Sequence, residues 1–271
     1  MTNAPATHAP SPLRRRDRGA IAILTLHRPQ SRNTLSERLM AELTAALAEI
    51  AEDRSIRAVI LAAEGPAFSS GHDLKEMTAR RADPDGGRAY FADVLGRCSA
   101  MMKQIVRLPQ PVIAAVEGIA TAAGCQLVAS CDLAVAGAEA RFATPGVHIG
   151  LFCLTPMVAL SRNVAPKHAM EMLLMGEMVS AEEACRMGLV NRVVPAGSAL
   201  DEALRMAEII ASKSAHTVRI GKRAFYEQLE MDLDEAYADA SRVMVENMLA
   251  RDAKEGIGAF VEKRQPVWAE T

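Results

Sequence analysis

Residues 118–126 read Gly-Ile-Ala-Thr-Ala-Ala-Gly-Cys-Gln, and residues 67–75 read Ala-Phe-Ser-Ser-Gly-His-Asp-Leu-Lys. Each stretch follows an apolar run that suits a buried strand and leads into a helical pattern. Small residues let backbone N–H groups approach a ligand closely, and a helix beginning near Gly124 leaves its first N–H groups unpaired. Two such loops side by side could bind a developing oxyanion. The bland alternative is that the small residues only make turns and allow close packing, and the pattern alone leaves both readings open.

Strands and helices alternate along the first half of the chain. After residue 150 helical patterns dominate, and the C-terminal part is expected to be helical throughout. This order predicts an α/β domain with a helical extension. Four apolar runs predict the buried strands, over residues 21–26, 58–61, 111–116 and 132–136.

Composition narrows the class of protein. The 271 residues carry 31 Lys and Arg against 33 Asp and Glu, for a net charge of -2. This nearly equal number of positive and negative residues argues against a nucleic-acid partner or a membrane-surface role, because both usually need a dense basic face. The five cysteines show no CxxC spacing, which is typical of reduced thiols in an intracellular protein.

Residues 1–18 are rich in Ala and Pro and contain Arg14, Arg15, Arg16 and Arg18. An Arg-rich, acid-poor leader resembles an organelle transit peptide, which would place the protein in the mitochondrial matrix. The segment is short and contains a single serine, so a flexible tail and a cytoplasmic protein are the favoured interpretation.

Several common site motifs are absent from the sequence. There is no GxGxxG after a strand, no Walker A loop, no HExxH and no GxSxG. The six histidines are scattered without metal-ligand spacing, so no metal site is predicted. These absences leave two classes of protein as candidates, a cofactor-free enzyme and a binding protein.

Five segments in order and spacing resemble the crotonase superfamily, the enoyl-CoA hydratase/isomerase family. The likeness runs from about residue 21 to the C-terminus, and the strings Ser-Ser-Gly-His-Asp-Leu and Ala-Ala-Gly-Cys-Gln-Leu are similar to its enoyl-CoA hydratase domain-containing protein 3 branch. The segments are residues 26–29 (Leu-His-Arg-Pro), 33–35 (Asn-Thr-Leu), 68–75, 123–127 (Ala-Gly-Cys-Gln-Leu) and 255–264.

The resemblance implies a crotonase-like spiral, a superhelix of ββα units, over residues 19–197. It implies a C-terminal helical trimerisation region over residues 198–271, with homotrimers or hexamers made of two trimers. It also implies an acyl-CoA thioester as the ligand, a role in fatty-acid or related acyl-CoA metabolism, and no cofactor besides the CoA of the substrate.

Site residues also follow from the resemblance. The oxyanion hole maps onto the backbone N–H groups of His72 and Ala123. The CoA pantetheine arm maps onto His72, Asp73, Leu74 and Lys75. Phosphate contacts map onto Arg28 and Arg32, and closure of the adenine end, from a neighbouring subunit, onto Phe260 and Lys263.

The sequence departs from the family pattern at two positions. Family hydratases hold and activate water with two glutamates, and Gln126 and Gly146 occupy those places here. Glutamine can orient a water but has no basic site, and glycine has no side chain. Positioned proton transfer typically contributes 10²–10⁴-fold, so we expect weak hydration, and the change Gln126→Glu with Gly146→Glu is predicted to raise it.

Structural interpretations compete for the individual residues. We expect His72 to act through its backbone, with its ring facing solvent or capping the next turn, and Asp73 to be a helix N-cap. Cys125 and Cys131 are expected in the core. The further polar candidates near the thioester are Ser69, Ser70, Thr144 and His148.

Three functions are left open by this reasoning. The first is an enoyl-CoA hydratase-like lyase of low hydration efficiency. The second is a decarboxylase of malonyl- or methylmalonyl-type CoA, or a thioester-cleaving relative, because an enolate needs an oxyanion hole and no strong base. The third is a non-catalytic acyl-CoA binder.

Overall fold

A computed structural model describes residues 10–269 of the chain. Its larger sheet has the strand order β1-β2-β3-β5-β7-β10, and its smaller sheet the order β4-β6-β8-β9. The larger sheet holds β1 (Leu13–Arg18), β2 (Ile21–Leu26), β3 (Ala58–Ala63), β5 (Val112–Val116), β7 (Leu133–Gly137) and β10 (Arg192–Val194). The smaller sheet holds β4 (Ala67–Ser69), β6 (Ile119–Thr121), β8 (Arg141–Ala143) and β9 (Val179–Ser180).

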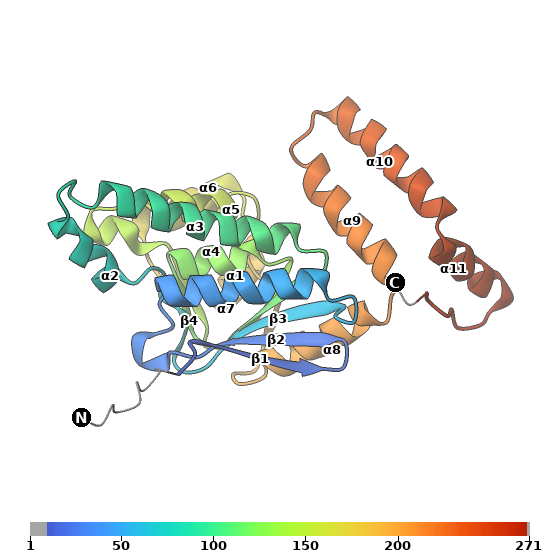
Figure 1. The fold of residues 1–271 in the computed structure, drawn as a ribbon, viewed down its shortest axis with the longest axis horizontal. Coiled ribbons are helices and arrows are strands. Elements are labelled where there is room, and N and C mark those ends of the chain that lie inside the picture. The colour runs from blue at the N-terminus through green and yellow to red at the C-terminus, as the bar shows by residue number, and fades with distance from the viewer. Residues whose placement is uncertain (1–9, 270–271) are drawn as a thin grey trace, which may run out of the picture.

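The helices surround and extend these sheets (Figure 1). The α-helices are α1 (Glu37–Glu52), α2 (Leu74–Ala79), α3 (Arg88–Arg107), α4 (Ala123–Ser130), α5 (Leu154–Leu160), α6 (Pro166–Met175), α7 (Ala181–Met187), α8 (Ala199–Ala211), α9 (Ala215–Gln228), α10 (Leu233–Leu249) and α11 (Arg251–Glu262). The 3-10 turns are η1 (Pro29–Ser31), η2 (Arg80–Ala82) and η3 (Pro145–Ile149). Among the described residues, no helix combines the length and apolar character needed to cross a membrane.

The two sheets are built from the same repeated unit. Each of β3, β5 and β7 in the larger sheet is followed directly by a short strand of the smaller sheet, β4, β6 and β8, and then by one or more helices. The strands of both sheets pair in parallel through these units. The α/β class and the ββα spiral predicted from the sequence are therefore confirmed. The resemblance implied the short second strands, but the sequence pattern did not mark them, because three residues are too few for a period-2 pattern.

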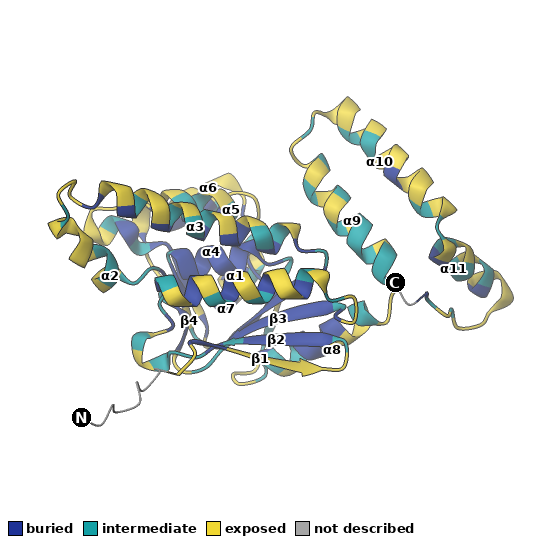
Figure 2. Cartoon of the chain, in the orientation of Figure 1, coloured by how far each residue is buried: buried dark blue, intermediate teal, exposed yellow. Residues whose placement is uncertain are grey.

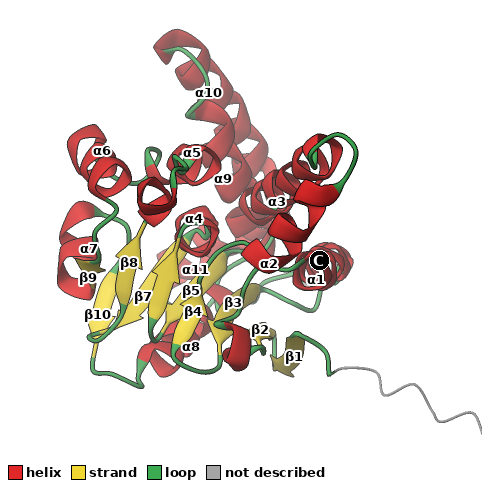
Figure 3. Cartoon of the chain, turned by 90° about the vertical axis from the view of Figure 1, so that its left-hand side faces the viewer, coloured by secondary structure: helices red, strands yellow, loops and turns green. Residues whose placement is uncertain are grey.

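The larger sheet is covered on both faces (Figure 3). Leu24 and Leu61 belong to the main apolar cluster with α1, α3 and α4, whereas Ile23 and Ile60 point to the other face and pack with α8. Strands buried on both faces explain the unbroken apolar runs in the sequence. The helix α8, which lies in the region expected to form the C-terminal extension, is thus part of the core by its packing.

The sequence predicts a flexible tail over residues 1–18, and this is wrong for residues 13–18. They form β1, which pairs antiparallel with β2 so that Leu13 lies opposite Leu26. Charged residues suit a strand at the edge of a sheet, because they face water and discourage pairing with other chains. Arg14, for example, forms an ion pair with Glu64 at 3.0 Å. Residues 1–9 of the predicted tail lie outside the described residues.

The helices α9, α10 and α11 form an arm that extends from the body (Figure 1) and is largely exposed in the single chain (Figure 2). A buried ion pair fixes its first helix to the body, since Lys222 Nζ lies 2.7 Å from Asp132 Oδ2. The Tyr226 hydroxyl also donates to Asp132 at 3.0 Å. Burial raises the pKa of Asp132 and lowers the pKa of Lys222, although their mutual attraction opposes both shifts. Removing one partner of such a pair leaves the other charge buried, which costs about 3–5 kcal/mol.

Candidate active site

The two loops singled out in the sequence meet at one edge of the small sheet. They follow β4 and β6, which pair in parallel, so both loops leave the sheet at the same end of its strands. Gly71 lies directly against the second loop. A Cβ atom at Gly71 would be 3.0 Å from the Ala122 Cβ and 3.1 Å from the Ala123 backbone nitrogen. The predicted convergence of the loops is therefore present.

The amides of His72 and Ala123 have no protein acceptor. Leu35 N donates to the Gly71 carbonyl at 2.8 Å, but the His72 and Ala123 N–H groups form no hydrogen bond within residues 10–269. Ala123 is the first residue of α4, whose first backbone bond from Gln126 N ends on the Ala122 carbonyl at 3.0 Å. Two unpaired donors thus lie next to each other at the positive end of a helix dipole.

Ala122 holds the second amide in a strained conformation. Its φ of 51° and ψ of -120° lie in a region that non-glycine residues rarely adopt. The Ala122 N–H donates to the Ala143 carbonyl at 2.9 Å, which ties this peptide to the neighbouring strand β8. Strain of this kind costs about 1–3 kcal/mol and is found at functional sites. Alanine gives no sign of such strain in a sequence, so this residue was missed.

The His72 side chain is not where the sequence predicted. Its ring faces neither solvent nor a cap, because both ring nitrogens are buried and have no hydrogen-bond partner within the described residues. Burial lowers the pKa of His72. The ring is therefore neutral at physiological pH, although the Leu35 backbone acts in the opposite direction and favours the charged form.

The N-cap interpretation of Asp73 is confirmed. Asp73 Oδ1 accepts from Lys75 N at 3.0 Å and from Glu76 N at 3.4 Å, at the start of α2. Its other oxygen accepts from the Thr34 hydroxyl at 3.1 Å. Leu74 is 50% exposed, and Lys75 is exposed too. The roles of these residues toward a ligand stay predictions.

A buried asparagine holds the first loop in place. Asn33 Nδ2 donates to the Glu64 carbonyl at 2.9 Å and to the Ala67 carbonyl at 2.8 Å. Its own carbonyl accepts from the Ser69 hydroxyl at 2.8 Å. The sequence marked Asn33 only as part of a resemblance, and its positioning role comes from these long-range contacts.

The two positions where family hydratases carry glutamates, 126 and 146, have different surroundings in this structure. Gln126 is 5% exposed on α4, and its Oε1 is buried without a partner among the described residues. Gly146 is buried in η3. A Cβ there would lie 2.6 Å from the Leu151 carbonyl oxygen and 2.9 Å from Cys153 Sγ. Any larger residue at 146 therefore requires the chain at 151–153 to move.

The side chains of the remaining candidates either contact backbone carbonyls or are buried in the core. The Thr144 hydroxyl donates to the Met172 carbonyl at 2.8 Å, and His148 Nε2 lies 3.3 Å from the Gly176 carbonyl oxygen. Burial raises the pKa of Cys125 to about 12, and Cys131 is buried in the same core, as predicted.

Arg28, Arg32, Phe260 and Lys263 were predicted to contact the CoA nucleotide. The Arg32 carbonyl accepts from Ser70 N at 3.1 Å, so Arg32 borders the first loop, and Arg28 donates to the Ser36 hydroxyl. Phe260 and Lys263 lie at the end of α11, far along the arm from α2 and α4 (Figure 1). Within one chain they do not reach the site, and their predicted role requires a neighbouring subunit.

Comparisons with known proteins agree with this fold and site. The family model described as Enoyl-CoA hydratase/isomerase matches residues 16–271. The crystal structure of enoyl-CoA hydratase from Mycobacterium smegmatis is 53% identical, with a TM-score of 0.90 over 95% of this chain and 98% of that one. The structure of human enoyl Coenzyme A hydratase domain-containing protein 3 is 48% identical, with a TM-score of 0.90 over 95% of this chain and 100% of that one.

The curated relatives give the same answer. The rat protein named enoyl-CoA hydratase domain-containing protein 3, mitochondrial, is 49% identical over 254 residues, which are 94% of this chain and 83% of the relative. The chain belongs to the enoyl-CoA hydratase/isomerase family, the crotonase family of enzymes. The likeness to the domain-containing protein 3 branch that was noted in the sequence is confirmed.

Proposed function

We propose that this protein binds an acyl-CoA thioester and polarises its carbonyl oxygen with the backbone N–H groups of His72 and Ala123. The observation that carries the proposal is the contact of Gly71 with residue 123, which brings two acceptor-free amides together. Each donor aimed at a developing oxyanion contributes about 3 kcal/mol in acyl-transfer enzymes. Fixed backbone donors also need no reorganisation during the reaction.

Hydration by this site is expected to be slow. The Gln126 amide can accept a hydrogen bond from a water but cannot take its proton. Gly146 contributes no group, and the Leu151 carbonyl lies where a side chain would begin. A site that stabilises the enolate without a nearby base loses the 10²–10⁴-fold that positioned proton transfer typically supplies.

Decarboxylation of a malonyl- or methylmalonyl-type CoA is the second candidate. In that reaction the bond from the α-carbon to the carboxylate breaks, CO₂ leaves, and the electron pair moves onto the thioester oxygen. The α-carbon then takes a proton from water. The absence of a carboxylate at positions 126 and 146 favours this reaction, because decarboxylation needs no side-chain base.

The test follows crotonyl-CoA by its ultraviolet absorbance and malonyl- and methylmalonyl-CoA by bicarbonate release. We expect concentration-dependent thermal stabilisation by acyl-CoA and slow hydration. Bicarbonate release selects the decarboxylase, and stabilisation without turnover of any thioester selects the non-catalytic binder. Absence of stabilisation by any acyl-CoA, or hydration at the rate of family hydratases, would overturn the proposal.

A single substitution sharpens the argument about the missing base. Gln126→Glu restores a carboxylate without changing the size of the side chain, and it should raise crotonyl-CoA hydration up to about 10²-fold. Gln126→Asn is the matched control, and no gain is expected from it. Adding Gly146→Glu, as the sequence suggested, now carries the cost of displacing residues 151–153.

We propose that no metal or resident cofactor takes part, since backbone donors supply the charge stabilisation. Chelation with EDTA should leave the rate unchanged. We further propose a homotrimer, or a hexamer of two trimers, because the arm exposes apolar side chains such as Tyr237 (70%), Leu249 (70%) and Phe260 (84%). Such patches mark association surfaces. Light scattering should give at least three times the 29.1 kDa chain mass.

The expected cytoplasmic location gains no support from the comparisons. The rat and human relatives are named mitochondrial, which favours the mitochondrial alternative for this chain. The arginines that suggested a leader do not add to that support, because Arg14 to Arg18 form β1. Fractionation of the native cells with antibody detection would test the location.

A further inference from the structure

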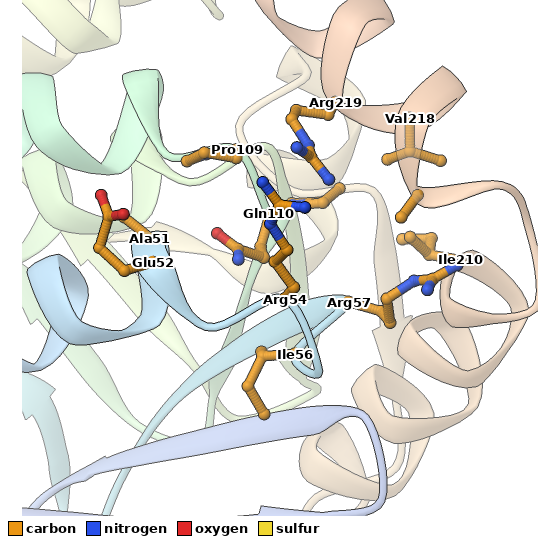
Figure 4. Close-up of a pocket in the computed structure, with 12 residues that line it drawn as sticks. Ala51, Glu52, Arg54, Ile56, Arg57, Pro109, Gln110, Ile210, Val218 and Arg219 are labelled. Carbon is orange, nitrogen blue, oxygen red and sulfur yellow. The ribbon is translucent and has the colours of Figure 1, made fainter. Parts of the chain in front are cut away.

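A cavity of about 150 Å³ lies at the other end of the sheet from the proposed thioester site (Figure 4). It is bordered by Arg57, which precedes β3, by Pro111, which precedes β5, and by the beginning of α9. The two loops of the proposed active site follow the opposite ends of these strands. Strands of five and six residues at about 3.3 Å per residue separate the two places by roughly 17–20 Å.

Three guanidinium groups line this cavity without a carboxylate partner. Arg54 and Arg57 come from the connection between α1 and β3, and Arg219 comes from α9 (Figure 4). None of the three forms an ion pair within the part of the chain that the structure describes. Glu52 also borders the cavity and is not paired with them. Like charges held around one small space need a counter-charge.

Two buried polar atoms at the cavity also have no partner. Gln110 is 7% exposed, and its Oε1 accepts no hydrogen bond within residues 10–269, although its Nε2 donates to the Ile50 carbonyl at 2.7 Å. Arg57 Nε is buried and unpaired, while Arg57 Nη2 donates to the Lys213 carbonyl at 3.1 Å. Buried polar atoms are nearly always paired in folded proteins, so the wall of this cavity is incompletely hydrogen-bonded within the described residues.

We propose that this cavity binds a small phosphate-type anion, and that inorganic diphosphate is a suitable probe. Guanidinium groups bind phosphate oxygens through paired hydrogen bonds. Sites for drug-sized ligands measure about 300–1,000 Å³, and the smaller cavity here suits the anion alone rather than a whole CoA.

The position of the cavity gives the anion a structural effect. Arg219 lies on the first helix of the arm, whereas Arg54 and Arg57 lie on the body. An anion held by both sides neutralises their repulsion and ties α9 to the body. A ligand that binds only the folded chain raises its stability with the logarithm of ligand concentration above the dissociation constant.

The test is thermal unfolding of the full-length protein in inorganic diphosphate, against NaCl of equal ionic strength. We expect a rise in the unfolding temperature that grows with the logarithm of diphosphate concentration and that NaCl does not reproduce. The double variant Arg54→Gln with Arg219→Gln should weaken the dissociation constant at least about tenfold, because it removes two charge-assisted contacts. Arg16→Gln is the control for loss of one surface charge, since Arg16 is exposed on β1.

Two outcomes would overturn the proposal. One is no specific shift with diphosphate, which is the result expected if a carboxylate of a second copy fills the cavity. The other is an equal shift in the wild type, the double variant and Arg16→Gln, which marks general screening of charge. Stabilisation by acyl-CoA is measured in the same variants and should be unchanged, so failure at the active site and failure here are distinguishable.

Discussion

The two loops of the proposed active site each present a backbone N–H group, but their backbones differ in conformation. In the first loop Gly71 has a φ of 85°, and glycine adopts this conformation without steric cost. In the second loop Ala122 has a φ of 51°, and its Cβ makes the same kind of turn costly. One amide is presented by a relaxed backbone and the other by a strained backbone.

The difference lies in what surrounds each loop. The first loop is tied to the body by hydrogen bonds of the Asn33 side chain and of Asp73. The second loop is enclosed by packing, with Ala123 1% exposed and α4 buried along its whole length. Close packing can hold a strained residue where a looser environment would release it. The comparison therefore predicts that the second loop tolerates little change in volume and benefits from relief of strain.

The largest effect is expected at Gly124. A Cβ there would lie 2.1 Å from the Ser69 carbonyl oxygen, so Gly124→Ala must separate α4 from β4. We expect a loss of at least about 3 kcal/mol in the free energy of unfolding, or no folded protein, measured by urea denaturation. Gly96→Ala on α3 has open space around the new Cβ and should gain about 1 kcal/mol. Equal stabilities of the two variants would contradict the packed second loop.

An intermediate effect is expected at Ala122. Glycine relieves about 1–3 kcal/mol of strain and loses about 0.5–1 kcal/mol through the entropy of the unfolded chain. Ala122→Gly should therefore stabilise the protein by about 1 kcal/mol, which thermal unfolding shows as a rise of about 2–4 °C. Turnover should fall at the same time, because the Ala123 amide is held less firmly. The exposed control Ala238→Gly on α10 should lower the free energy of unfolding by about 1 kcal/mol. A similar loss in Ala122→Gly would contradict the strain at Ala122.

The smallest effect concerns the pH dependence at His72. Burial depresses the pKa of this ring in the folded state, so below about pH 6.5 the unfolded chain binds a proton that the folded chain does not. Stability should fall as the pH drops below 6.5, by at most about 1.4 kcal/mol per pH unit from this group. His72→Asn should flatten that slope in urea denaturation at pH 7.5 and 5.5. An unchanged slope would mean that the ring is accessible to protons in the folded state.

Local patterns in the sequence predicted the α/β class, whereas the meeting of the two loops at His72 and Ala123 followed from the family resemblance. The apolar runs marked the parallel strands, and the strings around Gly71 and Gly124 marked the turns that present the amides. The sequence did not reveal the crowding at Gly146, because this depends on the later residues Leu151 and Cys153 folding back on it. Nor did it reveal β1, whose arginines look like a polar tail until β2 is there to pair with them.

The buried pair of Asp132 and Lys222 has a consequence for the direction in which the arm leaves the body. The pair lies where α9 packs against the body, so it fixes the direction of α9 by contacts within a single chain. Loss of either charge would leave the other charge buried without its partner and would weaken the attachment of the arm to the body. Because α10 and α11 follow α9 in the chain, a change in the direction of α9 would move every apolar side chain that the arm exposes.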